Sequence, residues 1–339
     1  IDGGRLRMNL EDQAMVMSFD LALLSGGQGA STVEGNLKRT VGQLDGEFGL
    51  LFNDFLAQDI ANLSPEFGLL SVLEAPISGA FRGSFNKDGN LNPMNATLKM
   101  GSGLFKPTSE IRAIAFNSAR TYFSYFPGSG EINIDEISFN SKDLRATADG
   151  NLFIEDIRDI PGTFVSQLNF TNLQTGGFGF LNNAISSNSA TATFRVQLDP
   201  FDVEIPQLYI HDKNSAVSVH TDGYVSIKDD KENDKWIVSL NSHSEAADLE
   251  SVLYFWPEKH KPKVRKWVAD HFKDSKLFDI SMQTEMENGL APKLSWSFAF
   301  SETSFSPLKG LPLIEQSNGH FVSKDYATSV ILEEGIIFD

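Results

Sequence analysis

The stretch that decides the fold is Ala190 to Asp199, which reads ATATFRVQLD. Its apolar and polar residues alternate strictly, so that every second side chain is apolar. A period of two places the apolar side chains on one face of a β-strand and the polar ones on the other. A helix, with about 3.6 residues per turn, would mix the two sets. The stretch therefore predicts a strand with one apolar and one polar face.

The same alternation recurs from end to end of the chain. Further examples begin at Met15, Ala96, Trp236, Ile280 and Trp296. Between the alternating stretches stand dipeptides that are typical of tight hairpin turns, because their residues tolerate positive φ angles. These dipeptides are Asp45-Gly46, Asp88-Gly89, Asp149-Gly150, Asp222-Gly223, Asn288-Gly289 and Asn318-Gly319. We therefore predict a mainly β fold with one extended antiparallel sheet, and a β-bulge where the alternation breaks between Asp135 and Ile137.

Short helices are predicted in two regions. Ser64-Pro65 is typical of a helix start and predicts a helix through about Leu73. In the second region, Ser244 is expected to cap a helix that ends near Phe255, and Pro262 is expected to start another. The apolar residues of this last helix share one face, and its lysines share the opposite face.

Composition excludes several classes of protein. The 339 residues include 28 Lys and Arg against 45 Asp and Glu, which gives a net charge of −17. Such an acidic chain is a poor partner for nucleic acid, whose phosphates must be neutralised. The chain has no Cys, which excludes disulfides, thiolate zinc sites and cysteine nucleophiles.

The sequence predicts no membrane-spanning helix. Its longest unbroken apolar run is Val252 to Trp256, whereas a spanning helix needs about 20 such residues. The chain opens with Ile1-Asp2-Gly3-Gly4, and we expect no signal peptide within it. We expect residue 1 to be a cut inside a longer protein, with any anchoring segment outside this chain.

Enzyme motifs are incomplete. Gly101-Ser102-Gly103 and Gly177-Phe178-Gly179 begin a dinucleotide-binding fingerprint, but neither has the third glycine or a following helix. The six His residues are scattered. His211, which precedes Asp212, and His220, two residues before Asp222, each lie beside a predicted turn, where solvated polar residues are ordinary. The sequence therefore predicts no catalytic residue, no metal site and no cofactor.

A basic cluster between residues 259 and 276 stands out from the acidic chain, with seven of its 28 positive residues. One interpretation is an interfacial helix that contacts a membrane or lipid headgroups. The candidate contact residues are Lys263, Lys266, Trp267 and Lys273. The alternative is a helix that covers the sheet and has an ordinary solvated face.

Aromatic composition indicates a large apolar surface. Phe outnumbers Tyr by 27 to 6, so most of the aromatic surface has no hydroxyl group to satisfy. Composition leaves two possibilities open, a closed hydrophobic core and an open groove that holds apolar ligands.

Two regions of the chain show a recognisable order of segments. The first contains APISGAF from Ala75 to Phe81, then Asp88-Gly89, Gly101-Ser102-Gly103 and FNSARTYF from Phe116 to Phe123. The second contains YFWP from Tyr254 to Pro257, KVRKWV from Lys263 to Val268, Ala299-Phe300, and PLKGLP from Pro307 to Pro312. Together they cover roughly residues 50 to 339, and they resemble bacterial AsmA-like proteins of the YhdP type.

The resemblance implies a repeating β-groove fold, in which a long twisted antiparallel sheet with a few short helices curls into an open hydrophobic groove. It implies a non-enzymatic protein of the Gram-negative periplasm, anchored in the inner membrane by a helix outside this chain. Such a protein would shield phospholipid acyl chains between the inner and outer membranes, and its partners would include outer-membrane or periplasmic proteins. The expected segments are a β-groove at 1–243, a helical insertion at 244–276 and a further β-groove at 277–339.

On this hypothesis, the groove is lined by apolar residues of alternating stretches. The candidates are Met17, Phe19, Leu98, Met100, Phe194, Val196, Leu198, Phe298 and Phe300. Replacing Phe194 or Phe298 by Asp is expected to block transport and leave the fold intact. Two alternatives are a structural or adhesive cell-surface β-repeat protein with a closed core, and a carbohydrate-binding β-protein whose tryptophans stack on sugars.

Overall fold

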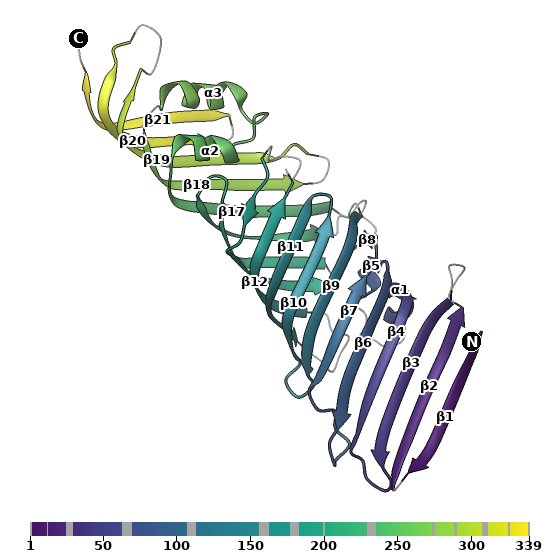
Figure 1. Ribbon diagram of the computed structural model, residues 1–339. Coiled ribbons are helices and arrows are strands. Elements are labelled where there is room, and N and C mark those ends of the chain that lie inside the picture. Colours follow the sequence, from purple (N-terminus) through teal and green to yellow (C-terminus); the bar gives the residue numbers. More distant parts are fainter. Residues whose placement is uncertain are drawn as a thin grey trace. The chain divides into compact units, whose positions relative to one another are not determined.

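A computed structural model describes residues 2–11, 13–24, 30–62, 70–106, 113–155, 163–176, 183–198, 201–228, 235–272, 275–287, 290–306, 311–324 and 326–337. The chain is mainly β, with 71% of it in strands and 9% in helices. In the described residues the strands form one open antiparallel sheet of 21 strands, accompanied by three short helices (Figure 1). The predicted fold class is confirmed.

The strands are long and follow one another closely along the chain. The first eleven are β1 Gly3–Glu11, β2 Ala14–Leu24, β3 Ala30–Thr40, β4 Gly46–Leu56, β5 Leu73–Glu74, β6 Pro76–Phe85, β7 Met94–Met100, β8 Gly103–Phe105, β9 Ile114–Phe126, β10 Glu131–Ser141 and β11 Leu144–Glu155. The next ten are β12 Thr163–Thr175, β13 Ser186–Ser187, β14 Ala190–Leu198, β15 Phe201–His211, β16 Ser218–Lys228, β17 Lys235–Ala247, β18 Lys276–Glu287, β19 Lys293–Phe305, β20 Ile314–Lys324 and β21 Ala327–Ile337. The helices are α1 Ala57–Ala61, α2 Leu249–Phe255 and α3 Pro262–His271.

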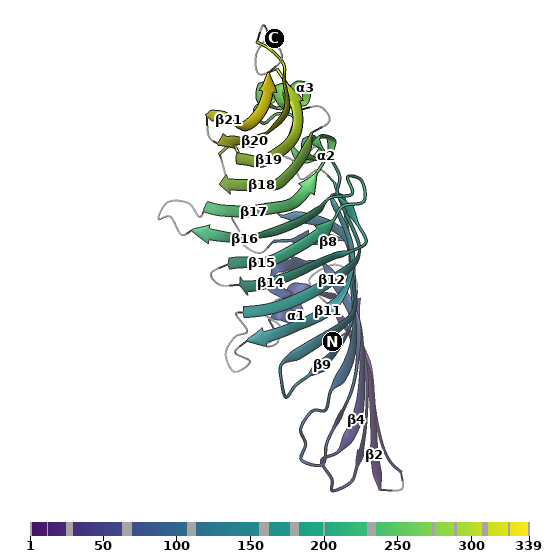
Figure 2. The same cartoon turned by 90° about the vertical axis from the view of Figure 1, so that its left-hand side faces the viewer.

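The chain is divided into two compact units. Unit 1 contains Ile1–Asn169 and Arg195–Phe201, and unit 2 contains Phe170–Phe194 and Asp202–Asp339. In unit 1 the strands pair in the order β1, β2, β3, β4, β6, β7, β9, β10 and β11, while the short β5 pairs with β8. In unit 2, β15 to β21 pair in chain order. Figure 2 shows the successive strands of each unit side by side.

Two of the predicted turn dipeptides lie at strand connections. Asp88-Gly89 lies in the turn between β6 and β7, and Gly89 has a φ of 82°. Asp45 ends the connection between β3 and β4, where the positive φ falls on Gly42, at 80°. Asn288-Gly289 lies outside the described residues.

The other three dipeptides are not turns, and the prediction was wrong for them. Gly150, Gly223 and Gly319 lie inside β11, β16 and β20. A Cβ atom on each would lie only 2.0 Å from a carbonyl oxygen of the adjacent strand, such as that of Gln167 or Ser239. Glycine is needed there because it alone lets the neighbouring backbone approach so closely.

β-Bulges recur in both units. The register of β10 against β11 shifts between Ile134 and Ile137, as the break in alternation predicted. Four other bulges contain a residue with positive φ, and these residues are Asp54 in β4, Asp279 in β18, Glu302 in β19 and Gln316 in β20. Such bulges bend a strand and increase its twist.

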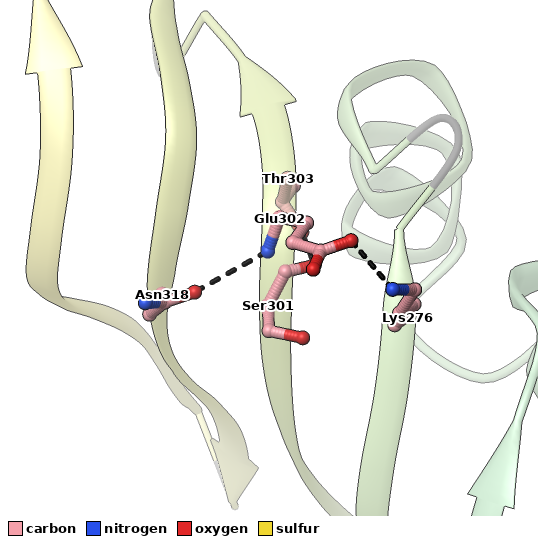
Figure 3. A network of polar contacts seen from close by, with 5 residues as sticks. All are labelled: Lys276, Ser301, Glu302, Thr303 and Asn318. Carbon is pink, nitrogen blue, oxygen red and sulfur yellow. Dashed lines mark hydrogen bonds and ion pairs between the residues drawn. The ribbon is translucent and has the colours of Figure 1, made fainter.

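Polar side chains from both neighbouring strands hold the bulge at Glu302 (Figure 3). From β20, Asn318 Oδ1 accepts a hydrogen bond from the backbone N–H of Glu302 at 3.3 Å. From β18, the Lys276 ammonium group forms an ion pair with the Glu302 carboxylate. The Thr303 hydroxyl donates to the carbonyl oxygen of Ser301 at 3.1 Å. The Asn318 side chain thus satisfies a backbone N–H that the bulge removes from the regular ladder.

The helical predictions were partly correct. The third helix starts at Pro262, as predicted. The second starts later than predicted, because Ser244 still belongs to β17 and the Asp248 side chain caps α2 by accepting from the N–H of Ser251 at 2.7 Å. Residues 63–69 of the first lie outside the described residues, but residues 70–72 form a 3₁₀ turn that ends directly before Leu73 begins β5, within one residue of the predicted end.

The segment predicted as a helical insertion at 244–276 contains several elements. It includes the end of β17, both α2 and α3, and the first residue of β18. The two helices therefore connect neighbouring antiparallel strands, since β17 pairs with β18 directly.

Candidate functional site

Unit 1 has one apolar sheet face, which cross-strand pairing builds from side chains far apart in the sequence. A row of directly paired residues crosses nine strands, and we call it the Phe19 row. It consists of Leu6, Phe19, Gly35, Leu50, Phe81, Ala96, Phe123, Ile134 and Gly150. Directly paired residues share a face in an antiparallel sheet. The row is therefore one continuous band across the unit.

Two further rows flank the Phe19 row on the same face. One consists of Met8, Met17, Leu37, Phe48 and Gly83. The other consists of Leu21, Val33, Phe52, Gly79, Leu98, Thr121, Ile137 and Ala148. We call the surface formed by the three rows the unit 1 apolar face.

The opposite face of unit 1, which we call the polar face, carries charged side chains, although it also includes Leu51, which pairs with Glu34. Arg5, Arg7, Asp20, Glu34 and Arg82 line a hollow of about 520 Å³ on that side. Charged groups lose their hydration when hydrocarbon covers them, which is costly unless they are paired. The two faces of unit 1 are therefore suited to different surroundings.

Glycines lie opposite aromatic residues on the unit 1 apolar face. A Cβ atom on Gly35 would meet ring atoms of Phe19 at 2.2 Å, and one on Gly83 would meet the ring of Phe48 at 2.7 Å. Each ring therefore lies over the glycine backbone of the adjacent strand in the sheet. Any larger residue at these glycines would displace the aromatic side chain.

A small core covers one end of this face. The α1 residue Ala57 packs with Phe52 and Ile77, which are only 6% and 0% exposed. Among the described residues of unit 1, α1 is the only α-helix, and a 3₁₀ turn at 70–72 adds Leu70 to the same core. Away from this core, Phe19, Leu50 and Phe123 are only partly buried, and so is Phe81, which packs against it. On the outer strand β1, the side chains Leu6, Met8 and Leu10 are 67%, 64% and 74% exposed.

The length of the Phe19 row can be compared with an acyl chain. Its nine strands are separated by eight steps of about 4.8 Å, which gives about 38 Å. One acyl chain spans half of a bilayer's hydrocarbon core, about 15 Å. The row is therefore long enough for an extended acyl chain to lie across the strands with room to move.

The corresponding face of unit 2 is closed where β18, β19 and β20 pack against α2 and α3. Trp256, which follows α2, stacks on Trp296 with ring centroids 5.3 Å apart. Phe272, at the end of α3, meets Phe298 and Phe300 edge-on at 5.6 and 5.1 Å. These side chains form a dense core with Phe321 and Leu277.

Two predicted groove residues need correction for this reason. Phe298 and Phe300 are 1% and 0% exposed, so they belong to a closed core and are not accessible to a ligand. We therefore expect Phe298→Asp to destabilise the fold, because a carboxylate there would be buried beside Phe321 without a partner. Alternation identifies the apolar face of a strand but does not indicate whether another element covers it.

The other predicted groove residues lie in two places. Met17, Phe19 and Leu98 are brought together on the unit 1 apolar face, and Met100 lies one position beyond Leu98 on the same side of β7, partly buried beside the α1 core. Phe194 and Val196 are partly buried on one side of β14, and Leu198 is the last residue of that strand. A groove-lining role for these three stays a prediction.

The basic residues around α3 have mixed roles. Lys263 and Lys266 are exposed, and headgroup contact stays a prediction for them. Trp267 is partly buried and stacks on His271 with centroids 4.8 Å apart. Lys273 lies outside the described residues. Arg265 is structural, since it donates hydrogen bonds to the carbonyl oxygens of Leu253 and Trp256 at the end of α2, at 3.0 and 3.1 Å.

Three residues in the middle of the unit 1 apolar face were missed. Leu50, Phe81 and Phe123 all lie in the Phe19 row. Each stands in a stretch where glycine, alanine or serine residues blur the alternation. The signal that finds them is the pairing register with strands whose alternation is clear.

The polar side of unit 2 carries a second hollow, of about 660 Å³, lined in part by Asp202, Glu204 and Asp222. Burial raises the pKa of Asp202, and the negative charge of Glu204 raises it further. Asp222 accepts a hydrogen bond from the Asn241 amide at 3.1 Å. Three acidic side chains therefore line this hollow, together with Ile205, Pro206 and Tyr224.

The described residues contain neither a cluster of metal ligands nor a helix that could span a membrane. Within the part of the chain that the structure describes, no group of three or more His, Asp or Glu side chains could hold a metal ion. No helix formed by those residues is both long enough and apolar enough to cross a membrane.

Comparison of the chain with protein-family models, with curated proteins and with solved structures gives no match.

Proposed function

We propose that this chain is a non-enzymatic lipid-transfer segment that shields phospholipid acyl chains on the unit 1 apolar face. The observation that carries the proposal is the Phe19 row, a band of paired apolar residues that runs across nine strands and is covered by a helix only at one side. The resemblance to AsmA-like proteins of the YhdP type adds the setting. The chain would act in the periplasm of a Gram-negative bacterium, between the inner and outer membranes, with its inner-membrane anchor outside this chain.

The energetics favour a path over a tight receptor. Each methylene group that leaves water for an apolar surface gains about 0.8 kcal/mol when it is fully buried. On an open face only one side of the chain is covered, so the gain per methylene is a fraction of that. Successive positions along the row are similarly apolar, so that a chain can move between them without crossing a large barrier. The headgroup would stay in solvent, which fits the absence of a recognisable headgroup motif in the sequence.

Photocrosslinking at neighbouring positions tests the proposal. Phe123 lies in the Phe19 row, whereas Tyr122 points to the polar face and pairs with Thr97 and Glu136. A benzoylphenylalanine introduced at position 123 is expected to crosslink phospholipid acyl chains when the chain is expressed in Gram-negative cells and irradiated. The same residue at position 122 is the matched control, because both positions carry an aromatic ring in the native chain.

The result is measured by mass spectrometry of the crosslinked peptide. Lipid adducts at position 123 and none at position 122 would support the proposal. Equal adducts at both positions, or none at either, would contradict it.

The closed core under α2 and α3 favours a second candidate, a structural or adhesive β-repeat protein. In that case the unit 1 apolar face would be buried by another protein surface. Crosslinks from position 123 to protein, with no lipid adduct, would support this second candidate.

A further inference from the structure

The polar face of unit 1 carries a continuous band of polar residues without an acidic member, which we call the Asn36 row. Each member is next in the sequence to a member of the Phe19 row, so its side chain points to the opposite face. Direct cross-strand pairing joins the row across seven strands. Its members are Asn36, Gly49, Arg82, Asn95, Ser124, Asn133 and Asn151.

The composition of this row runs against the preferences of a β-strand. Asparagine occupies four of its seven positions, although Asn is depleted in strands and enriched in turns. Where a local preference is broken repeatedly, the site is expected to serve a function. The four asparagines therefore indicate that the row is used for its amide groups.

The amide groups of the row are available to a ligand. Asn36, Asn95 and Asn133 are exposed. Within the described residues, the side chains of Asn36, Asn133 and Asn151 have no hydrogen-bond partner. Asn95 Oδ1 accepts from the Ser124 hydroxyl at 2.9 Å, which orients this amide and leaves its two N–H donors for a ligand.

Part of the row lies in the hollow of about 520 Å³ on the polar face, where Asn36, Gly49 and Arg82 belong to the lining. Gly49 has no side chain, and a Cβ atom there would lie only 3.1 Å from the Asn36 amide oxygen. Leu51 and Ala80, which pair with each other, line the same hollow. The hollow therefore offers amide groups beside a small aliphatic surface.

The charges around the row favour a neutral ligand. Arg82 is its one charged member, and the acidic side chains Asp20 and Glu34 line the same hollow. A polyanion would be repelled by these two carboxylates. A protein partner would need aromatic or large apolar anchors, which the row lacks.

A neutral sugar chain fits both properties of the hollow. Each of its hydroxyl groups is a donor and an acceptor, as an amide group is. The C–H groups of its rings suit an aliphatic surface such as that of Leu51 and Ala80.

The spacing of the row suits an extended chain of sugars. Its seven strands are separated by six steps of about 4.8 Å, which gives about 29 Å. One step is close to the length of a single pyranose ring. Successive sugars would therefore lie over successive strands.

We propose that the Asn36 row binds an extended neutral oligosaccharide, whose hydroxyl groups form hydrogen bonds with Asn36, Asn95 and Asn133. The Arg82 guanidinium group donates to further sugar oxygens, and sugar C–H groups contact Leu51 and Ala80. The site lies on the face opposite to the unit 1 apolar face and does not depend on acyl-chain binding there.

Saturation-transfer difference NMR tests the proposal with cellohexaose and chitohexaose, two neutral hexasaccharides, added to the full chain. Saturable binding of at least one is expected. Asn95→Ala and Asn133→Ala each remove one amide group and are expected to weaken binding about three- to tenfold. The two positions are two strand steps apart, about 10 Å, so the double variant is expected to combine both losses. Since both side chains are exposed, the melting temperature should stay unchanged.

Asn117→Ala is the matched control, because Asn117 is an exposed asparagine on β9 outside the row. It is expected to leave binding unchanged. Hexagalacturonate, an anionic chain with the same number of sugars, is expected to bind more weakly than the neutral chains. The proposal is overturned if neither neutral hexasaccharide binds, if Asn117→Ala weakens binding as much as Asn95→Ala, or if hexagalacturonate binds more tightly than both.

Discussion

A carboxylate at position 19 would stand within the unit 1 apolar face. Phe19 pairs with Leu6 on one side and with Gly35 on the other, and its ring lies over the Gly35 backbone. The side chain is partly buried but is not part of the core around α1. Phe19→Asp is therefore expected to leave unit 1 folded while it interrupts the band that an acyl chain would follow.

The size of the effect follows from two contributions. Full burial of a Phe side chain is worth about 1.5–3 kcal/mol, and since Phe19 is already partly buried, about 1 kcal/mol of contact with a passing chain is lost. A carboxylate in a hydrocarbon environment costs about 2.5–3.5 kcal/mol, of which about 2 kcal/mol remains on an open face. The sum of about 3 kcal/mol corresponds to a factor of about a hundred, at about 1.4 kcal/mol per factor of ten.

The assay measures transfer of a phospholipid with a fluorescent acyl chain from donor to acceptor vesicles. We expect Phe19→Asp to lower the protein-dependent transfer rate about a hundredfold. Ser18→Asp is the matched control, because it adds the same charge at the adjacent residue on the polar face, where Ser18 pairs with Arg7. Its rate is expected to stay within about twofold of the native rate. Normal transfer by a Phe19→Asp variant with an unchanged melting temperature would refute the reasoning.

Three further predictions concern stability. Phe272→Ala, which removes a ring that is 0% exposed, should lower the free energy of unfolding in urea by about 3–5 kcal/mol. Gly223→Ala, whose Cβ would lie 2.0 Å from the carbonyl oxygen of Ser239, should lower the free energy of unfolding by about 2–3 kcal/mol in thermal unfolding. Gly3→Ala, with nothing within 4 Å of the added Cβ, should lower it by almost nothing. Equal effects of the two substitutions would contradict the close-approach argument. Burial and the positive charge of Lys261 lower the pKa of His260 in the folded chain. As the pH falls, the unfolded chain therefore binds a proton at this histidine more readily than the folded chain does. The free energy of unfolding consequently falls as the pH drops below about 6.5. His260→Gln should reduce that loss in urea titrations at several pH values, and an unchanged pH dependence would count against it.

The sequence predicted the fold class because side-chain alternation is a local signal. It located strands such as β2, β7 and β14, and the break at Asp135 located the bulge in β10. It failed where the same local chemistry serves two structures. Asp149-Gly150 has the composition of a hairpin turn, but a glycine inside a strand, beside a closely approaching neighbour, requires the same freedom.

The start of α2 was missed for a similar reason. Ser244 is a good N-cap by residue type, yet β17 continues to Ala247, which pairs with Leu277 in β18. The ladder between β17 and β18 joins segments more than thirty residues apart in the sequence, and a local propensity does not contain it.

The candidate site was only half predictable. Met17 and Phe19 alternate in the same way as Phe298 and Phe300, so no local pattern distinguishes an open face from a covered one. The difference comes from Phe272 on α3, which packs on β19 and leaves no room for a ligand there. Coverage is a tertiary property and needs the placement of the helices.

The pairing of glycines with aromatic residues has a consequence for the texture of the surface. On a typical sheet, side chains of different sizes make ridges and dips across the strands. Where Gly35 faces Phe19 and Gly83 faces Phe48, each ring fills the dip that the glycine leaves. The filled dips make the surface more even, which would lower the barrier for a hydrocarbon chain that moves across the strands.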